Sequence, residues 1–232
     1  MLPKGTGRGE SLARLAERIR AVEAGLSGEQ CGVVSTGWSE VDAWLPGGGM
    51  RRGATHEVMG IAEGGGWVVP ASVVLHLARA GCGGGGVWTV LIGRRVWPNP
   101  VMAARVCGGT WLSRSVWFDP PDGGSRAWAI DAALRCGGVV VVADGTGLDS
   151  AGSRRLQLAA EAGGTFGLLV RPPGEGGSVS FAWSRWSVRW ARPVAGVSAM
   201  RPRWVLTLER CKGVGRCASG VMGLFCLWGG SG

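Results

Sequence analysis

The sequence predicts an α/β domain in which a mostly parallel central sheet is flanked by helices, with an N-terminal helix and an antiparallel C-terminal extension. From residue 55 onward, strand-like and helix-like segments alternate, which is typical of a parallel sheet covered by helices. Several strand candidates are short, nearly continuous apolar runs, as strands buried on both faces require. After Pro172-Pro173 the alternation stops, and strand-like segments with arginine-containing loops follow.

An amphipathic helix is predicted near the N-terminus. Its apolar residues recur at alternating spacings of three and four, at Leu12, Leu15, Ile19, Val22 and Leu26. A helix this short is marginal alone and must pack on something. It packs either on its own domain or on a neighbouring subunit or partner, so these five residues are our candidates for partner binding. Residues 1–32 form this helix and a linker.

The expected α/β core follows at residues 33–212. Its strand candidates are Thr55–Met59, Val87–Ile92, Val116–Phe118, Val139–Val142 and Phe166–Val170, and its helix candidates are Val68–Ala80, Val101–Cys107, Ser125–Cys136 and Ser153–Ala162. The antiparallel extension is expected from Val179–Trp190 and Trp204–Leu208. Residues 213–232 are rich in glycine, and a flexible, poorly ordered tail is expected there.

Composition limits the classes of function. The chain has 232 residues, enough for one large domain, and a formal net charge of +9, yet Lys4 and Lys212 are its only lysines. Its seven cysteines include no Cys-x-x-Cys pair and are accompanied by two histidines, so we expect reduced thiols and no metal site. There is neither a signal-peptide pattern nor an apolar run of about 18 residues, which predicts a cytoplasmic protein without membrane contact.

The segment after the first core strand is the place to look for phosphate binding, because it is glycine-rich and leads into a helix. Gly60 and Gly65 fit the spacing of a P-loop. Gly66 stands where the lysine belongs, and Trp67 stands where the magnesium-binding Ser or Thr belongs. These replacements predict a vestigial phosphate loop, with no catalytic residue and no bound cofactor. An anion site made by backbone amides is the alternative.

The motifs around this segment resemble those of the bacterial RecA recombinases. They are Ser35-Thr36-Gly37, Val41-Asp42, Gly47-Gly48-Gly49-Met50, Gly53 and Glu57-Val58-Met59-Gly60. Later motifs resemble a narrower family, the RecA/SulA-like ImuA proteins associated with translesion DNA synthesis. These are Trp128-Ala129-Ile130, Ala133-Leu134-Arg135-Cys136, residues 154–161, Leu169-Val170-Arg171-Pro172, Ser184-Arg185-Trp186-Ser187-Val188 and residues 203–210. The resemblance covers residues 33–213 and implies a RecA-like fold.

Carried over residue by residue, the nucleotide site of the recombinase is mostly missing. Gly66 and Trp67 match its P-loop lysine and threonine, and Arg95 matches the glutamate that polarises the attacking water. An arginine stays protonated and cannot act as this base. Asp144 alone matches, as a Walker-B-like aspartate, and its other interpretation is a turn residue at the end of a strand. The resemblance therefore implies a RecA-like fold that has lost ATP hydrolysis.

Arginines concentrate toward the C-terminus. The DNA-binding candidates are Arg185, Arg189, Arg192, Arg201 and Arg203. Strand alternation places Trp183 on the same face as Arg185 and Arg189, a combination that can follow phosphates and stack a base. A half-buried strand with a solvated basic side is the other interpretation. We expect DNA binding to be weak, sensitive to salt and independent of sequence.

The family resemblance implies a non-catalytic accessory protein of the SOS-induced translesion synthesis complex, the mutasome. The implied partners are an ImuB-like Y-family polymerase homologue, an error-prone DNA polymerase III alpha-type subunit, RecA itself and, weakly, DNA. One alternative is a DNA-dependent ATPase or recombinase, in which an arginine near the loop would replace the missing lysine; the candidates are Arg51, Arg52, Arg94 and Arg95. The other alternative is a SulA-like inhibitor of cell division.

Overall fold

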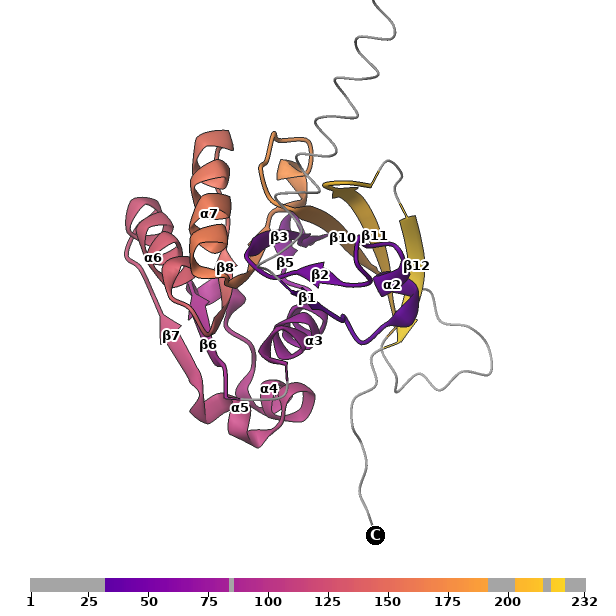
Figure 1. The fold of residues 1–232 in the computed structure, drawn as a ribbon, viewed down its shortest axis with the longest axis horizontal. Coiled ribbons are helices and arrows are strands. Elements are labelled where there is room, and N and C mark those ends of the chain that lie inside the picture. The colour runs from indigo at the N-terminus through magenta and orange to yellow at the C-terminus, as the bar shows by residue number, and fades with distance from the viewer. Residues whose placement is uncertain (1–31, 84–85, 192–202, 215–217, 224–232) are drawn as a thin grey trace, which may run out of the picture. The chain divides into compact units, whose positions relative to one another are not determined.

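The strands of the central sheet are β3 (Ala54–Met59), β6 (Trp88–Ile92), β7 (Ser115–Phe118), β8 (Val139–Asp144), β9 (Phe166–Arg171), β10 (Ser184–Trp190), β11 (Arg203–Cys211) and β12 (Ala218–Gly223). They form an eight-stranded sheet in the order β12-β11-β10-β3-β9-β8-β6-β7 (Figure 1). The strands from β10 to β7 are parallel, whereas β11 and β12 continue the sheet in antiparallel pairing. This computed structural model describes residues 32–83, 86–191, 203–214 and 218–223. The predicted fold class is confirmed.

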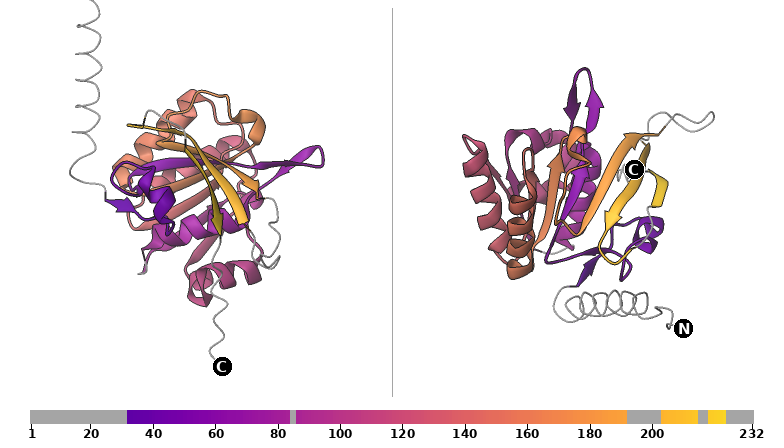
Figure 2. Two further views of the ribbon diagram at one scale, coloured as in Figure 1. Left: turned by 90° about the vertical axis from the view of Figure 1, so that its right-hand side faces the viewer. Right: turned by 90° about the horizontal axis from the view of Figure 1, so that it is seen from above.

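Helices cover both faces of the parallel part of the sheet. They are α2 (Ser39–Ala43), α3 (Ala71–Cys82), α4 (Pro100–Cys107), α5 (Gly109–Ser113), α6 (Gly123–Arg135) and α7 (Ser150–Gly163), with 3-10 turns η1 (Arg94–Val96) and η2 (Pro173–Glu175). One face carries α6 and α7 side by side, and the other carries α3 with α4 packed against it (Figure 1, Figure 2). Short pairs complete the fold: β1 (Val33–Val34) with β2 (Met50–Arg51), and β4 (Ile61–Glu63) with β5 (Gly66–Val68).

Two apolar clusters fill the space between the sheet and its helices. The larger cluster joins α2 and α3 to the sheet and includes the side chain of Trp186, which is 2% exposed. The smaller cluster joins α6 and α7 to β6, β8 and β9. Every residue of β3 and β9 is buried. The nearly continuous apolar run of β9 predicts this burial, whereas β3 also buries the polar side chains of Thr55, His56 and Glu57.

Local signals explain why several helices begin earlier than the periodicity predicts. The side chains of Asn99, Asp122 and Asp149 accept hydrogen bonds from the first-turn amides of α4, α6 and α7. Left-handed Gly83 and Gly164 follow the ends of α3 and α7, where glycine adopts the required positive φ at little cost. Among the described residues, no helix is long and apolar enough to cross a membrane.

Two sequence expectations for the C-terminal part need correction. Strand β10 begins at Ser184, five residues later than the expected start at Val179, because the preceding residues form the connection from β9. Part of the expected flexible tail, Ala218–Gly223, is strand β12, which pairs with β11 along its length. The predicted N-terminal helix lies outside the described residues.

Candidate functional site

In folds of this kind, ligands bind at the carboxyl edge of the parallel sheet. The shape of the segment between β3 and α3 therefore decides whether this chain has a phosphate-binding loop. This segment is a hairpin of β4 and β5 that projects from the sheet (Figure 2). Gly64 and Gly65 form its turn with φ values of 56° and 78°, the left-handed pair that a tight hairpin turn requires. The expected glycine-rich phosphate loop is therefore wrong in form: Gly66 and Trp67 lie on β5, and α3 begins only at Ala71.

The start of α3 also differs from a phosphate-binding helix. Its N-cap is Pro70, which offers no amide donor and no side-chain cap. The amides of Ala71, Val73 and Val74 already donate to the carbonyl oxygens of Val69 and Pro70, at 2.7 to 3.0 Å. A phosphate loop needs such amides directed at the anion.

Trp67 occupies the place of the hydroxyl residue and makes two close contacts. Its ring lies against Gly60, so closely that a Cβ at Gly60 would come within 2.2 Å of Trp67 Cε3. The Arg95 guanidinium stacks on this ring, with its Cζ 4.5 Å from the ring centroid. The resemblance matches Trp67 and Arg95 to the recombinase's threonine and glutamate, and the structure brings these two side chains into direct contact.

Asp144, the Walker-B-like residue, ends β8 and has its carboxylate occupied by neighbours. Its Oδ1 accepts hydrogen bonds from the backbone N and the Oγ1 of Thr146, at 3.0 and 2.5 Å. Its Oδ2 lies 3.7 Å from Arg126 Nη1 and 3.9 Å from Arg95 Nε. Asp144 thus holds the turn after β8, as the second interpretation of this residue proposes, and pairs with arginines where the recombinase would hold a magnesium nucleotide.

The arginines invoked for the ATPase alternative lie at two different edges of the sheet. Arg94 and Arg95 are in η1 after β6, at the carboxyl edge, and Arg94 Nε pairs with Asp119 Oδ2 at 2.6 Å. Arg52 precedes β3 at the amino edge and donates to the carbonyl of Gly81 near the end of α3. Neither Arg51 nor Arg52 can therefore substitute for the missing lysine.

An open cavity of about 850 Å³ lies at this amino edge, away from the Trp67–Arg95–Asp144 cluster. Its lining includes His76, Arg79 and Arg114. The cavity thus does not coincide with the position of a nucleotide in the recombinases.

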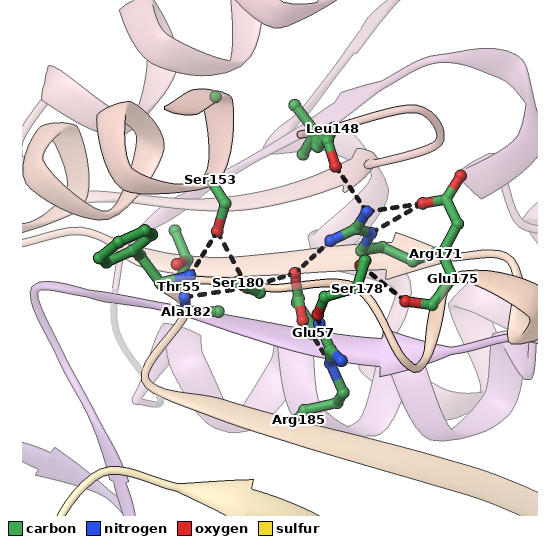
Figure 3. Close-up of polar contacts among 12 residues, drawn as sticks. Thr55, Glu57, Leu148, Ser153, Arg171, Glu175, Ser178, Ser180, Ala182 and Arg185 are labelled. Carbon is green, nitrogen blue, oxygen red and sulfur yellow. Dashed lines mark hydrogen bonds and ion pairs between the residues drawn. The ribbon is translucent and has the colours of Figure 1, made fainter. Parts of the chain in front are cut away.

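A buried ionic network around Glu57 was missed by the sequence analysis (Figure 3). Glu57 is fully buried in the middle of β3. Its Oε1 accepts hydrogen bonds from Arg171 Nη1 at 2.8 Å and Ser180 Oγ at 2.7 Å, and its Oε2 accepts one from Arg185 Nε at 2.7 Å. Burial raises the pKa of Glu57, but these hydrogen bonds outweigh it, so the pKa lies below its ordinary value.

The same network fixes the connection between β9 and β10. Arg171 donates from Nε and Nη2 to Glu175 Oε2, at 3.0 and 2.7 Å. Arg185 donates from its two Nη atoms to the carbonyl oxygens of Gly176 and Ser178. Two arginines and two glutamates therefore join three neighbouring strands and the loop above them.

This geometry overturns one DNA-binding candidate. Arg185 is 5% exposed, and its guanidinium faces Glu57 and the loop carbonyls, so it is not available to a nucleic acid. Arg189 is exposed near the end of β10, and Arg203 is half-buried at the start of β11. Arg192 and Arg201 lie outside the described residues, as do the partner-binding candidates Leu12, Leu15, Ile19, Val22 and Leu26.

The order of the sheet, its two helical layers and the position of the altered phosphate segment define a RecA-like α/β domain. No family model matches the chain. It is 33% identical over 196 residues to Protein ImuA of Caulobacter vibrioides, in strain NA1000 / CB15N and in strain ATCC 19089 / CIP 103742 / CB 15, over 78% of this chain and 79% of the relative. The chain belongs to the ImuA family.

Proposed function

We propose that this chain is a non-catalytic, RecA-like accessory protein of the SOS-induced translesion synthesis complex in the cytoplasm. It would link an ImuB-like Y-family polymerase homologue and an error-prone DNA polymerase III alpha-type subunit to damaged DNA, with RecA as a further partner. Membership of the ImuA family supports a role in translesion synthesis after DNA damage, which is the coarser part of this function. Arg189 and Arg203 are the described candidates for weak DNA contact.

The contact between Trp67, Arg95 and Asp144 is the observation that carries the non-catalytic part of the proposal. The Trp67 ring lies under the Arg95 guanidinium, and the same guanidinium faces the Asp144 carboxylate. A nucleotide at this edge would meet an indole and a cation where magnesium and an attacking water must be held. Arg95, at the position of the catalytic glutamate, cannot accept a proton from water. The Asp144 carboxylate already accepts two hydrogen bonds from Thr146 and faces two arginines, which disfavours its action as the base.

We expect the purified full-length chain to hydrolyse ATP no faster than its Gly65→Asp variant, with or without single-stranded DNA. Gly65 is in the hairpin turn, where a carboxylate would repel a triphosphate. The measurement is release of phosphate at several enzyme concentrations, with a RecA recombinase as the positive control. ATP turnover that scales with the chain and is abolished by Gly65→Asp contradicts the proposal and favours the ATPase alternative.

We also expect the tagged chain to retain a Y-family polymerase homologue when cells are exposed to DNA damage and the extract is treated with nuclease. The measurement is identification of the co-purified proteins by mass spectrometry, against an untagged strain. Retention of neither polymerase nor RecA, with binding only to DNA, contradicts the linking role. Filamentation of undamaged cells on overexpression would instead favour the cell-division alternative.

A further inference from the structure

The outer surface of α6 carries an unusually exposed tryptophan. Trp128 is 64% exposed, although tryptophan is normally highly buried in folded proteins. Helix α6 lies beside α7 on the outside of the sheet, so this residue is on the outer layer of the domain (Figure 1, Figure 2). Tryptophan is enriched at protein interfaces relative to the rest of the surface, so this residue is a candidate contact for a partner.

Helical geometry places further side chains beside this tryptophan. Trp128, Asp131 and Arg135 are spaced by three and four residues and lie on one stripe of α6. Arg155 and Leu158 are three residues apart on α7, and Leu158 is 52% exposed. Asp131 Oδ1 accepts a hydrogen bond from Arg155 Nε at 3.0 Å, which connects the two stripes across the seam. We call these five residues the seam surface.

The seam surface has an excess of positive charge. Both oxygens of Asp131 accept hydrogen bonds from Arg135, at 3.1 and 3.3 Å, in addition to the bond from Arg155. Burial raises the pKa of Asp131, but the two arginines outweigh it and keep the carboxylate ionised. One negative charge therefore faces two positive charges. The arginine side chains remain 52% and 55% exposed, whereas that of Asp131 is 11% exposed.

Asp131 also holds these guanidiniums in place. Arg155 uses its Nε on Asp131, and within the part of the chain that the structure describes its Nη atoms make no recorded hydrogen bond. Arginines fixed in this way lose less freedom when a carboxylate partner binds their remaining donors. Tryptophan and arginine are the residues that most often dominate the energy of protein interfaces.

We propose that the seam surface is a docking site for an acidic protein segment that carries a large apolar side chain. The apolar side chain packs on the exposed ring of Trp128, and carboxylates of the segment bind the outward guanidinium donors of Arg135 and Arg155. Protein fits this surface better than DNA, because the exposed Leu158 side chain offers apolar contact but no face on which a base could stack. The proposal goes beyond the linking role above, and it does not depend on which protein is the partner.

The first test places the photo-crosslinking residue p-benzoylphenylalanine at position 128 of the full-length chain in damaged cells. The control places it at Val101, which is 61% exposed on α4. We expect position 128, and not position 101, to crosslink to a protein segment that contains several carboxylates and a large apolar residue. Crosslinks to DNA, to a second copy of this chain or to a segment without excess acidic residues overturn the proposal, as does the absence of any crosslink.

The second test measures binding of the crosslinked segment, as a synthetic peptide, to the purified full-length chain. We expect Trp128→Ala to weaken binding at least tenfold, Trp128→Phe to retain most of it, and Val101→Ala to leave it unchanged. Arg155→Gln should weaken binding and reduce its dependence on salt. Unchanged affinity in Trp128→Ala overturns the proposal, and equal stability of this variant and the parent in urea excludes unfolding as the cause of a loss. If no polymerase co-purifies but the crosslinking and peptide-binding tests give the expected results, the linking role is refuted and the docking proposal stands.

Discussion

Glu57→Gln is expected to lower the free energy of unfolding by about 3–5 kcal/mol, the cost of removing one partner from a buried ion pair. The amide is close in size to the carboxylate, so the change is mainly one of charge. It leaves the side chains of Arg171 and Arg185, which are 1% and 6% exposed, without their shared counter-ion. Glu175 still faces Arg171, but its side chain is 26% exposed and is more weakly coupled. Urea denaturation of the purified chain measures this change.

The matched control is Asp119→Asn, which removes the carboxylate from the ion pair with Arg94. That pair is as short as those of Glu57, at 2.6 Å, but its side chains are 78% and 38% exposed. Exposed pairs contribute about 0–1 kcal/mol, so the control should change stability little. Equal effects of the two substitutions would show that the buried network does not stabilise the fold in the way argued.

Loss of the Glu57 charge should also change the connection after β9. Arg171 and Arg185 hold Glu175 and the carbonyl oxygens of Gly176 and Ser178. Both arginines are positioned by Glu57, so this acidic residue on β3 determines the shape of a loop that is more than a hundred residues away in sequence. The recombinase fold uses loops at this edge for function. In this chain, the buried arginines Arg171 and Arg185 fix the loop between β9 and β10 through hydrogen bonds.

The alternation of strand-like and helix-like segments predicted the parallel sheet, and several core strands, such as β8 and β9, are nearly continuous apolar runs. Strands β8 and β9 could be located in this way within two residues of their ends. The ionic network around Glu57 could not be located from the sequence, because Arg171 and Arg185 are 114 and 128 residues away from Glu57. A charged residue inside an apolar strand was the available signal, since such a residue is rarely buried without a partner.

The sequence analysis also misjudged the exposure of Arg185. Alternation places Arg185 and Arg189 on one face of β10, and the register shift in the pairing with β11 does not change this, because the skipped residue, Glu209, lies on β11. A single sequence does not reveal that Glu57 and the loop before β10 cover Arg185 on this face. Arg189, farther along the strand, remains exposed.

The phosphate segment shows how spacing alone misleads. Gly60 and Gly65 match the P-loop spacing, yet the pair Gly64-Gly65 is also the signature of a two-residue hairpin turn. The residue that decides between them is Trp67, whose ring packs on Gly60 and under Arg95. Strand β12 was missed for a related reason, because its glycine-rich sequence has low strand propensity and it forms through pairing with β11.

His56, next to Glu57 on β3, is buried in its neutral form. Its Nε2 lies 2.9 Å from the carbonyl oxygen of Arg51, which can only accept, so Nε2 must carry the proton. Its Nδ1 then accepts from Ser184 Oγ at 2.7 Å, while Ser184 in turn accepts from Trp186 Nε1 at 2.8 Å. Burial lowers the pKa of His56 to about 4, although the bond to Arg51 partly opposes this shift.

The free energy of unfolding is therefore expected to fall by up to about 3 kcal/mol between pH 6.5 and pH 4 because of His56. The contribution is fully present above pH 6.5, where His56 is neutral in both states. As the pH falls, the unfolded chain binds a proton that the folded chain excludes, until the pH reaches the folded pKa. Urea denaturation at pH 7, 6 and 5 measures this slope.

His56→Gln separates this effect from other acid-sensitive groups, because glutamine can donate and accept hydrogen bonds without titrating. We expect the variant to lose most of the slope between pH 7 and pH 5 while being less stable at pH 7. His76, whose pKa burial also lowers, accounts for a smaller remaining slope, which His76→Gln should remove. Glu57 does not interfere, because its pKa is below the ordinary carboxyl value and its contribution is lost only at more acidic pH. An unchanged slope in His56→Gln would mean that His56 binds protons equally well in the folded and the unfolded chain, which its burial and its two hydrogen-bond partners argue against.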